Sequence, residues 1–183
     1  MSLPHIILSL LVSEKQTGYN IYCQLAGDRD AIANKFWTSS HQQIYRELGA
    51  MEKKLLVTCV EIPQEGNPNR KLYTITKSGK AHYLAWLEKA PSLGIIRDAM
   101  VARVYNAKPS EYPVVLTSLG NYQILVEEKL HDLGISLSHA EGMAVGRQKA
   151  LDELVILNAI SHFTNLLNFA VDSQAMIKAR MVE

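Results

Sequence analysis

The fold is decided by residues 38–76, which are TSSHQQIYRELGAMEKKLLVTCVEIPQEGNPNRKLYTIT. Hydroxyl side chains begin this stretch, and Gln43 follows Ser40 at the spacing of a capping box, which predicts that a helix begins at His41. Four apolar residues then recur at spacings of four, three and four, as on the buried face of one helix: Ile44, Leu48, Met51 and Leu55. The opposite face is polar, and a helix of this kind fits the major groove of DNA.

The pattern changes from helix to strand after this helix. Residues 57–62 are rich in β-branched side chains, residues 64–69 are dense in turn formers, and residues 70–76 are a second β-rich run, which together predict a β-hairpin with a long tip. Thr76 is then expected to cap a helix over residues 77–89. Four of its apolar side chains are expected to fold back over the hairpin: Ala81, Leu84, Ala85 and Leu87.

Two shorter helices are expected before residue 38. Residues 3–12 have an apolar stripe at helical spacing, and Thr17, after a polar turn, is expected to cap a second helix that ends near Gly27. Residues 28–35 are a polar connection. The order helix, helix, helix, hairpin, helix over about 90 residues is the outline of a winged helix-turn-helix, in which the third helix enters the major groove and the hairpin contacts the flanking backbone.

The second half of the chain is expected to be helical, after a connector at residues 90–94 that contains Pro and Gly. A short helix over residues 95–106 precedes a long helix that begins at residues 109–111 and a final helix that begins at Arg147. Both long helices have apolar stripes in which spacings of three and four residues alternate. This spacing is typical of helices that pack on other helices. The protein is therefore expected to be mainly α-helical.

These two stripes contain more apolar surface than two helices packed only on each other would cover. Burial of apolar surface stabilises by roughly 25 cal/mol per Å², so we expect a second copy of the chain to cover it. A two-fold dimer would set two recognition helices about 34 Å, or a multiple, apart and would bind a palindromic operator. The residues expected in the dimer interface are Leu119, Tyr122, Val126, Leu130, Phe163 and Leu167.

Composition and charge favour a soluble protein that binds a polyanion. The chain has 48% hydrophobic and 20% charged residues, as globular proteins do. Residues 1–90 have 11 basic and 8 acidic side chains, whereas residues 91–183 have 8 basic and 10 acidic ones, so the positive charge lies in the first half. The longest apolar window, residues 151–171, contains several polar side chains and is interpreted as a buried helix of a soluble, cytoplasmic protein.

The sequence has none of the motifs that would indicate catalysis or a cofactor. A phosphate-binding Gly-rich loop, the zinc-protease motif HExxH and the nucleophile motif GxSxG are all absent. The cysteines Cys23 and Cys59 are far apart, with no histidine at metal-ligand spacing, so they are expected to be reduced and packed as small apolar residues, with a redox-sensing thiol as the alternative. We therefore expect neither an enzyme nor a metal or cofactor site.

The sequence resembles the PadR family of transcription regulators and, within it, the AphA-like subgroup. The matching segments are Met1–His5, Thr17–Tyr19, Phe36–Trp37, Ser40–Leu48, Val57–Val60 and Pro63–Gly66, together with Arg70 and Lys71. The resemblance implies a winged-helix DNA-binding domain over residues 1–90, an antiparallel coiled-coil-like dimerisation domain over residues 95–183, and control of transcription without catalysis. Where the commoner PadR sequence has Thr-Leu-Tyr-Pro, this chain has Gln43-Ile44-Tyr45-Arg46, so a different operator is expected.

The polar face of the third helix and the wing supply the expected DNA contacts. The amides of Gln42 and Gln43 can each bond adenine at two points, and the Arg46 guanidinium fits guanine or a phosphate. Phosphate contact is expected from His41 and from Tyr45, with packing of Tyr45 on the first helix as the alternative. The wing is expected to meet the DNA backbone or the minor groove. The complete set of expected DNA-binding residues is Ser40, His41, Gln42, Gln43, Tyr45, Arg46, Asn67, Arg70 and Lys71.

Two other functions are compatible with this sequence. One is a winged-helix module that binds protein instead of DNA, which the polar face of the third helix disfavours. The other is a repressor that responds to a small aromatic ligand, because some members of the PadR family respond to phenolic acids.

Overall fold

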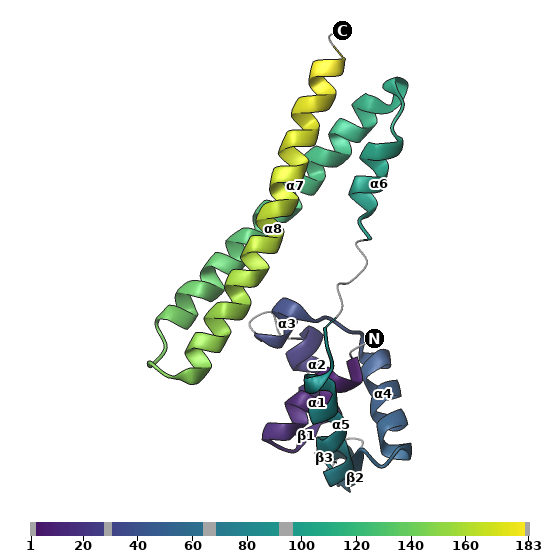
Figure 1. Ribbon diagram of the computed structural model, residues 1–183, viewed down its shortest axis with the longest axis vertical. Helices are drawn as coiled ribbons and strands as arrows, with labels where there is room; N and C mark the ends of the chain where they lie inside the picture. Colours follow the sequence, from purple (N-terminus) through teal and green to yellow (C-terminus); the bar gives the residue numbers. More distant parts are fainter. Residues whose placement is uncertain (1–2, 28–30, 64–68, 92–96, 182–183) are drawn as a thin grey trace. The chain divides into compact units, whose positions relative to one another are not determined.

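The computed structural model describes residues 3–27, 31–63, 69–91 and 97–181, and the chain forms two compact units, Met1–Ser92 and Leu93–Glu183 (Figure 1). The helices of the first unit are α1 (Leu3–Ser13), α2 (Gly18–Tyr22), α3 (Ala33–Phe36), α4 (His41–Lys53) and α5 (Lys77–Glu88), and a π-helix over Cys23–Gly27 continues α2. The caps predicted at Thr17, Ser40 and Thr76 are confirmed. The short α3 is an addition, since residues 28–35 were expected to be an irregular connection.

A three-stranded antiparallel sheet lies beside these helices in the order β1-β3-β2. The predicted hairpin is confirmed as β2 (Val57–Ile62) and β3 (Arg70–Ile75), paired from Val57 with Ile75 to Ile62 with Arg70. The sequence did not predict β1 (Gln16–Thr17), which pairs with β3 at Tyr73 and Leu72.

The side chain of Gln16 explains why a strand forms where a polar turn was expected. This side chain is buried, its Nε2 donates to the Leu10 carbonyl at 3.2 Å, and its Oε1 accepts from Gln24 Nε2 at 2.9 Å. The polar group is therefore satisfied inside the fold, and the turn between α1 and α2 is fixed to the base of the wing.

The core of the first unit forms where α1, α2 and α4 meet the sheet. Its fully buried side chains include Ile7, Leu8, Leu11, Ile21, Leu25, Ile44 and Leu48. The prediction that Leu55 belongs to the buried face of α4 is wrong, because Leu55 is 73% exposed and has a positive φ of 58°. The amide of Leu56 donates to the Met51 carbonyl at 2.9 Å, as at a helix C-terminus with a left-handed residue, so Leu56 turns into the core instead.

The side of α5 that packs on the core also differs from the prediction. All four residues expected to cover the hairpin are exposed: Ala81, Leu84, Ala85 and Leu87. The helix instead packs through Gly79, Tyr83 and Trp86. The apolar pattern did not identify this side because its closest contact is made by a glycine and the rest by aromatic rings.

His5 of α1 stacks on both His82 and Trp86 of α5. The ring centroids lie 5.1 and 5.0 Å apart with interplanar angles of 9° and 11°, and Nδ1 of His5 is buried without a hydrogen-bond partner among the described residues. Burial, and then the nearby His82, lower the pKa of His5. The folded unit therefore favours the neutral imidazole.

We expect the first unit to lose stability as the pH falls from about 6.5, the pKa of an unperturbed histidine, through the lower pKa of folded His5. In this range the unfolded chain binds a proton that the folded chain does not. Chemical unfolding at pH 7.5 and 5.5 measures the difference, and His5→Phe, which keeps a stacking ring, should reduce it. An unchanged pH dependence in His5→Phe would assign the effect to another group.

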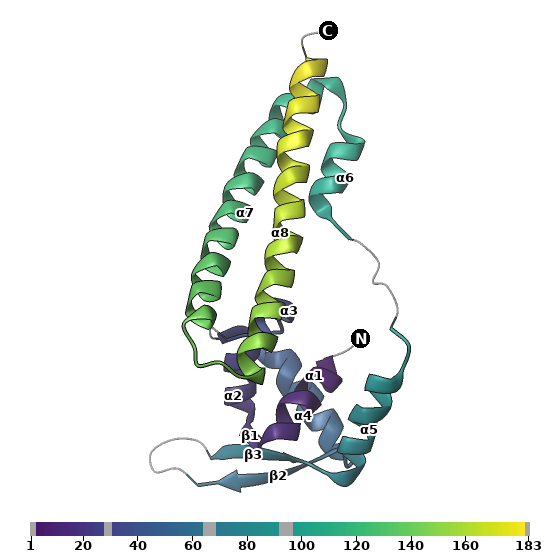
Figure 2. The same ribbon diagram turned by 60° about the vertical axis from the view of Figure 1, so that its left-hand side comes forward.

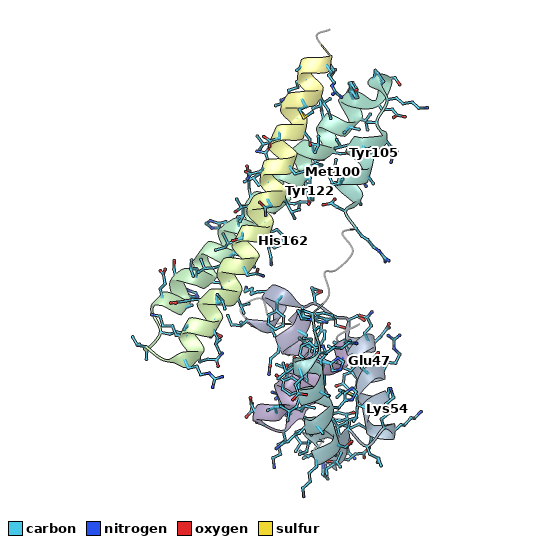
Figure 3. All side chains as sticks on the ribbon, in the orientation of Figure 1. Glu47, Lys54, Met100, Tyr105, Tyr122 and His162 are labelled. Carbon is cyan, nitrogen blue, oxygen red and sulfur yellow. The ribbon has the colours of Figure 1, made fainter. Side chains whose placement is uncertain are left out.

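The second unit consists of α6 (Ala99–Asn106), a 3₁₀ turn over Pro109–Glu111, α7 (Tyr112–Glu141) and α8 (Arg147–Arg180). The two long helices confirm the prediction and form an antiparallel hairpin (Figure 2), joined by a hydrogen bond of 2.8 Å from Gln174 Nε2 to Gln123 Oε1. Met100 of α6 is buried against this hairpin, and Tyr122 packs in the same cluster (Figure 3).

The apolar stripes of α7 and α8 are covered only in part within the chain. Leu119 and Val126 are already buried in the hairpin, so they are not the free apolar surface that the sequence predicted, whereas Tyr122, Leu130, Phe163 and Leu167 are half-buried. A stripe at heptad-like spacing packs first on the neighbouring helix of its own chain. The exposed apolar residues are instead Val114, Ile124, Leu125 and Ile135 of α7 and Leu151, Leu154, Leu157, Val171 and Met176 of α8.

The interpretation of residues 151–171 as a buried helix is wrong for the single chain. Only 17% of the most apolar window of α8 is buried, and α8 is the one helix of the described residues that is long and apolar enough to cross a membrane. Length and composition alone are weak evidence for a membrane span, because the core helix of a soluble protein has the same properties.

Candidate nucleic-acid interface

The N-terminal half of α4 presents most of the predicted DNA-binding residues to solvent. Ser40, His41, Gln42, Gln43 and Arg46 are exposed, and Tyr45 is half-buried. Ile44 and Leu48 are fully buried on the opposite side and hold the helix on the core. Glu47 and Lys54 mark the middle and the C-terminal end of α4 in Figure 3.

Gln42 and Gln43 differ in what their amides are free to do. The Oε1 atom of Gln43 accepts hydrogen bonds from Ser39 Oγ at 3.0 Å and from the Ser40 amide at 3.2 Å, which completes the capping box. The side-chain amide of Gln42 makes no hydrogen bond within the described residues. A bidentate contact to adenine needs both the amide oxygen and the amide nitrogen, so Gln42 can make it and Gln43 is a capping residue.

Aromatic rings order the start of α4 against α2. His41 lies 4.4 Å from Tyr45 and 5.3 Å from Tyr22 between ring centroids. The ring of Tyr45 packs directly on Gly18, because a Cβ added to Gly18 would lie 2.8 Å from that ring. Burial raises the pKa of Tyr45, so its hydroxyl stays protonated and can donate to a phosphate. The predicted alternative of packing on the first helix is replaced by packing on α2.

A groove of about 410 Å³ separates α4 from β3, and we call it the wing groove. Its walls are Thr17, Gly18, Tyr19, Tyr45, Gly49, Glu52, Asn69, Arg70, Lys71 and Tyr73. The structure thus brings Tyr45 together with Arg70 and Lys71, which lie 25 and 26 positions away in the sequence. Asn67, which was also expected to contact DNA, lies outside the described residues.

Arg70 and Lys71 at this groove and Arg46 on α4 differ in the ion pairs that they form. Lys71 Nζ lies 4.0 Å from Glu61, and the exposed Arg46 guanidinium lies 3.8 Å from its neighbour Glu47. Within the described ranges Arg70 forms no ion pair. Exposed ion pairs of this length contribute little, so all three cations can turn to a phosphate, and Arg70 gives up no partner in doing so.

Tyr19, for which the sequence left packing on the recognition helix and DNA contact equally open, is a further residue of this surface. It is 62% exposed, it borders the wing groove, and its phenol stands near Arg70. In the sequence, only the resemblance of the segment Thr17–Tyr19 pointed to this residue. The pairing of β1 with β3 brings the segment to the wing groove.

The remaining polar groups of the described residues form no metal site and no reactive thiol site. No cluster of three or more His, Cys, Asp or Glu side chains that could hold a metal ion occurs in those ranges. Cys23 and Cys59 are both free and half-buried, and burial raises the pKa of the Cys59 thiol. A raised pKa keeps the thiol protonated, which disfavours the redox-sensing alternative for Cys59.

Comparison with known proteins identifies the first unit. Residues 7–85 match the family model of the Transcriptional regulator PadR-like family. The first unit of this chain is similar to the PadR-like family, over 79 of the chain's 183 residues. The resemblance inferred from the sequence is therefore confirmed.

Two curated relatives of this PadR-like chain are transcriptional regulators. The probable transcriptional regulator Rv1176c of Mycobacterium tuberculosis is 40% identical over 87 residues, which are 48% of this chain and 44% of that protein. The negative transcriptional regulator PadR of Bacillus subtilis is 29% identical over 104 residues, which are 56% of this chain and 55% of that protein. The matches span about half the length of these relatives.

Solved structures resemble the PadR-like chain over nearly its whole length. Bacillus subtilis PadR in complex with operator DNA has a TM-score of 0.77 at 24% identity and covers 97% of this chain and 99% of that chain. The Vibrio cholerae virulence activator AphA has a TM-score of 0.64 at 26% identity, with 98% and 99% covered. The predicted mainly α-helical fold, with a winged helix followed by long helices, is confirmed.

Proposed function

We propose that this chain is a sequence-specific DNA-binding transcription regulator that acts as a homodimer on a palindromic operator. In this proposal residues 1–90 bind DNA and residues 95–183 form the dimer. The observation that carries the proposal is the solvent-open polar face of α4, with the free amide of Gln42 and the exposed Arg46, next to the cations of β3. The solved complex of Bacillus subtilis PadR with operator DNA, which has the same fold, supports it.

The surface suggests separate roles for its residues. Gln42 and Arg46 contact base edges in the major groove. Ser40, His41 and Tyr45 contact phosphates beside them, while Arg70, Lys71 and Asn67 of the wing, joined by Tyr19, bind the flanking backbone. Gln43 acts on the DNA indirectly, because it fixes the first turn of α4.

We also propose that the protein acts by binding DNA, without catalysis and without a cofactor. Its proposed location is the cytoplasm. The polar, solvent-open face of α4 favours DNA over a protein partner, because protein interfaces have fewer charged residues at their centre. A response to a small effector is compatible with this function, since Bacillus subtilis PadR has also been solved in complex with p-coumaric acid.

The dimer in this proposal is formed by the exposed apolar residues of α7 and α8, together with the half-buried Tyr122, Leu130, Phe163 and Leu167. A second copy covers this face better than lipid does, because α8 contains Asn158, Asn165 and Asn168, which are costly to place in a bilayer without partners.

Gel-shift titrations test the DNA contacts once genomic footprinting has supplied a bound site. We expect Gln42→Ala and Arg46→Ala each to weaken specific binding by about 1–3 kcal/mol, because each removes a bidentate contact. Arg70→Ala should weaken binding to all sequences and reduce the salt dependence, since it removes a phosphate contact.

Gln43→Ala is the matched control for Gln42→Ala. It should lower the stability of the first unit by about 1 kcal/mol through loss of the capping box, whereas Gln42→Ala should leave stability unchanged. Unchanged specific affinity in both Gln42→Ala and Arg46→Ala would refute the assignment of α4, and a lack of enriched DNA would favour the protein-binding module.

A further inference from the structure

Gly49 lies in the interior of α4, where a glycine destabilises a helix relative to alanine. Gly18 and Gly79 are required by packing inside the chain, because a Cβ at Gly18 would meet the Tyr45 ring and a Cβ at Gly79 would meet the backbone of Leu56. In contrast, no described residue lies within 4 Å of a Cβ built on Gly49. Packing within the described part of the chain therefore does not require a glycine at position 49.

The side of α4 that contains Gly49 is the side proposed to face DNA. Gly49 follows Gln42 by seven positions and Tyr45 by four, so the three residues share one side of the helix. Ile44 and Leu48 form the buried side instead. Because Gly49 lines the wing groove, a side chain added there would extend into the groove and not into the core.

The wing groove is positioned to receive one strand of a DNA duplex. In the proposed function, on which this inference rests, α4 enters the major groove and the wing contacts the flanking backbone. A single sugar-phosphate strand separates the major groove from the minor groove beside it, so this strand would pass between α4 and β3. The wing groove, of about 410 Å³, is the space between these two elements.

The charges along the groove restrict where a phosphate can lie. Arg70 supplies a cation, and the protonated hydroxyl of Tyr45 can donate to the same anion. Glu52, the acidic side chain among the lining residues, repels a phosphate. Gly49 lies four positions after Tyr45 and three before Glu52, so the uncharged deoxyribose is the part of the strand expected beside it.

We propose that Gly49 allows the deoxyribose of one DNA strand to lie directly against α4, which brings a flanking phosphate within reach of Tyr45 and Arg70. A side chain at position 49 would hold the strand away from the helix and lengthen these contacts. Sugars and phosphates are the same at every step of DNA, so the loss applies to all sequences alike. Gly49 is thus a positioning residue of the interface and does not read bases.

Gel-shift titrations of full-length Gly49→Ala and Gly49→Leu test this inference, on the bound site and on an unrelated duplex of equal length at low salt. We expect Gly49→Ala to weaken binding about threefold and Gly49→Leu at least about tenfold, by the same factor on both duplexes, because an overfilled contact is destabilising. Urea unfolding should show both variants at least as stable as the parent, since alanine and leucine are favoured over glycine in a helix.

Ala81→Leu is the control, because it adds a bulky side chain at an exposed position of α5 and should leave DNA binding unchanged. Parental affinity in both Gly49 variants, while Gln42→Ala and Arg46→Ala still weaken binding, would refute this inference and leave the proposed function intact. A loss confined to the bound site would place Gly49 at base edges and contradict the backbone contact. Lower stability in both variants would show that the fold itself needs the glycine, which also overturns the inference. A parent protein that binds neither duplex would overturn the proposed function and this inference with it.

Discussion

Leu125→Glu combined with Leu154→Glu is expected to convert the proposed dimer into a monomer. Leu125 of α7 is 63% exposed and Leu154 of α8 is 64% exposed, so neither side chain holds the hairpin of its own chain together. A two-fold interface contains each substituted position twice, so four introduced carboxylates would have to be desolvated without partners. The folded single chain, in contrast, can leave them in water.

The same double substitution should also reduce operator affinity by a factor of roughly 10² to 10⁴, because the second half-site no longer benefits from linkage to the first. Sedimentation at micromolar concentration and gel shifts on the enriched site measure the two effects. Leu84→Glu is the control, since Leu84 is similarly exposed at 55% but lies on α5 of the first unit. Dimers that persist in the double variant would exclude this face as the interface.

Gly79→Ala is expected to destabilise the first unit by about 3 kcal/mol or more, a large share of the ~5–15 kcal/mol that folds a typical domain. A Cβ at this position would overlap the carbonyl oxygen of Leu56 and come within 2.8 Å of the Ile75 side chain. Leu56 cannot yield easily, because its carbonyl also accepts from the Thr76 amide at 3.0 Å and the Thr76 hydroxyl at 3.1 Å.

Gly49→Ala, in α4, is expected to change the stability of the first unit in the opposite direction. Nothing lies within 4 Å of a Cβ at Gly49, and alanine is favoured over glycine inside a helix by roughly 0.5–1 kcal/mol, so this variant should be slightly more stable than the parent. Both tryptophans, Trp37 and Trp86, lie in the first unit, so their fluorescence during urea unfolding follows that unit alone. Equal midpoints for the two variants would contradict the close approach at Gly79.

The elements that the sequence predicted correctly are those with local signals. The capping box at Ser40, the cap at Thr76 and the two β-rich runs lie within a few residues of the structure that they specify. The strand β1 has only two residues and exists because it pairs with Tyr73 and Leu72, far along the chain, so no local pattern could reveal it.

The sequence also assigned some apolar residues to the wrong face of their helix, for a different physical reason. Apolar spacing alone placed Leu55 in the core, but α4 ends at Lys53, two residues before Leu55, and Leu56 takes the buried position. The periodic stripe on α7 was correct in register, yet Leu119 and Val126 pack within their own chain because the antiparallel hairpin brings α8 against them.

The candidate site was predicted in outline but not in its division of roles. The polar face of α4 followed from residue types, whereas the difference between Gln42 and Gln43 depends on which amide oxygen accepts from Ser39 and Ser40. Tyr19 joined the surface only through the tertiary placement of α2 beside β3.

The ring contacts around His41 have a consequence for the entropy of association. Tyr22, His41 and Tyr45 restrain one another's rotamers, and Gly18 leaves room for the Tyr45 ring at the end of this row. Ordering a free side chain at an interface costs about 0.5–1.5 kcal/mol, and these rings are already ordered before DNA arrives. The phosphate-binding part of the proposed surface is thus preorganised, while Gln42 and Arg46 keep the conformational freedom to adapt to different base pairs during a search along DNA.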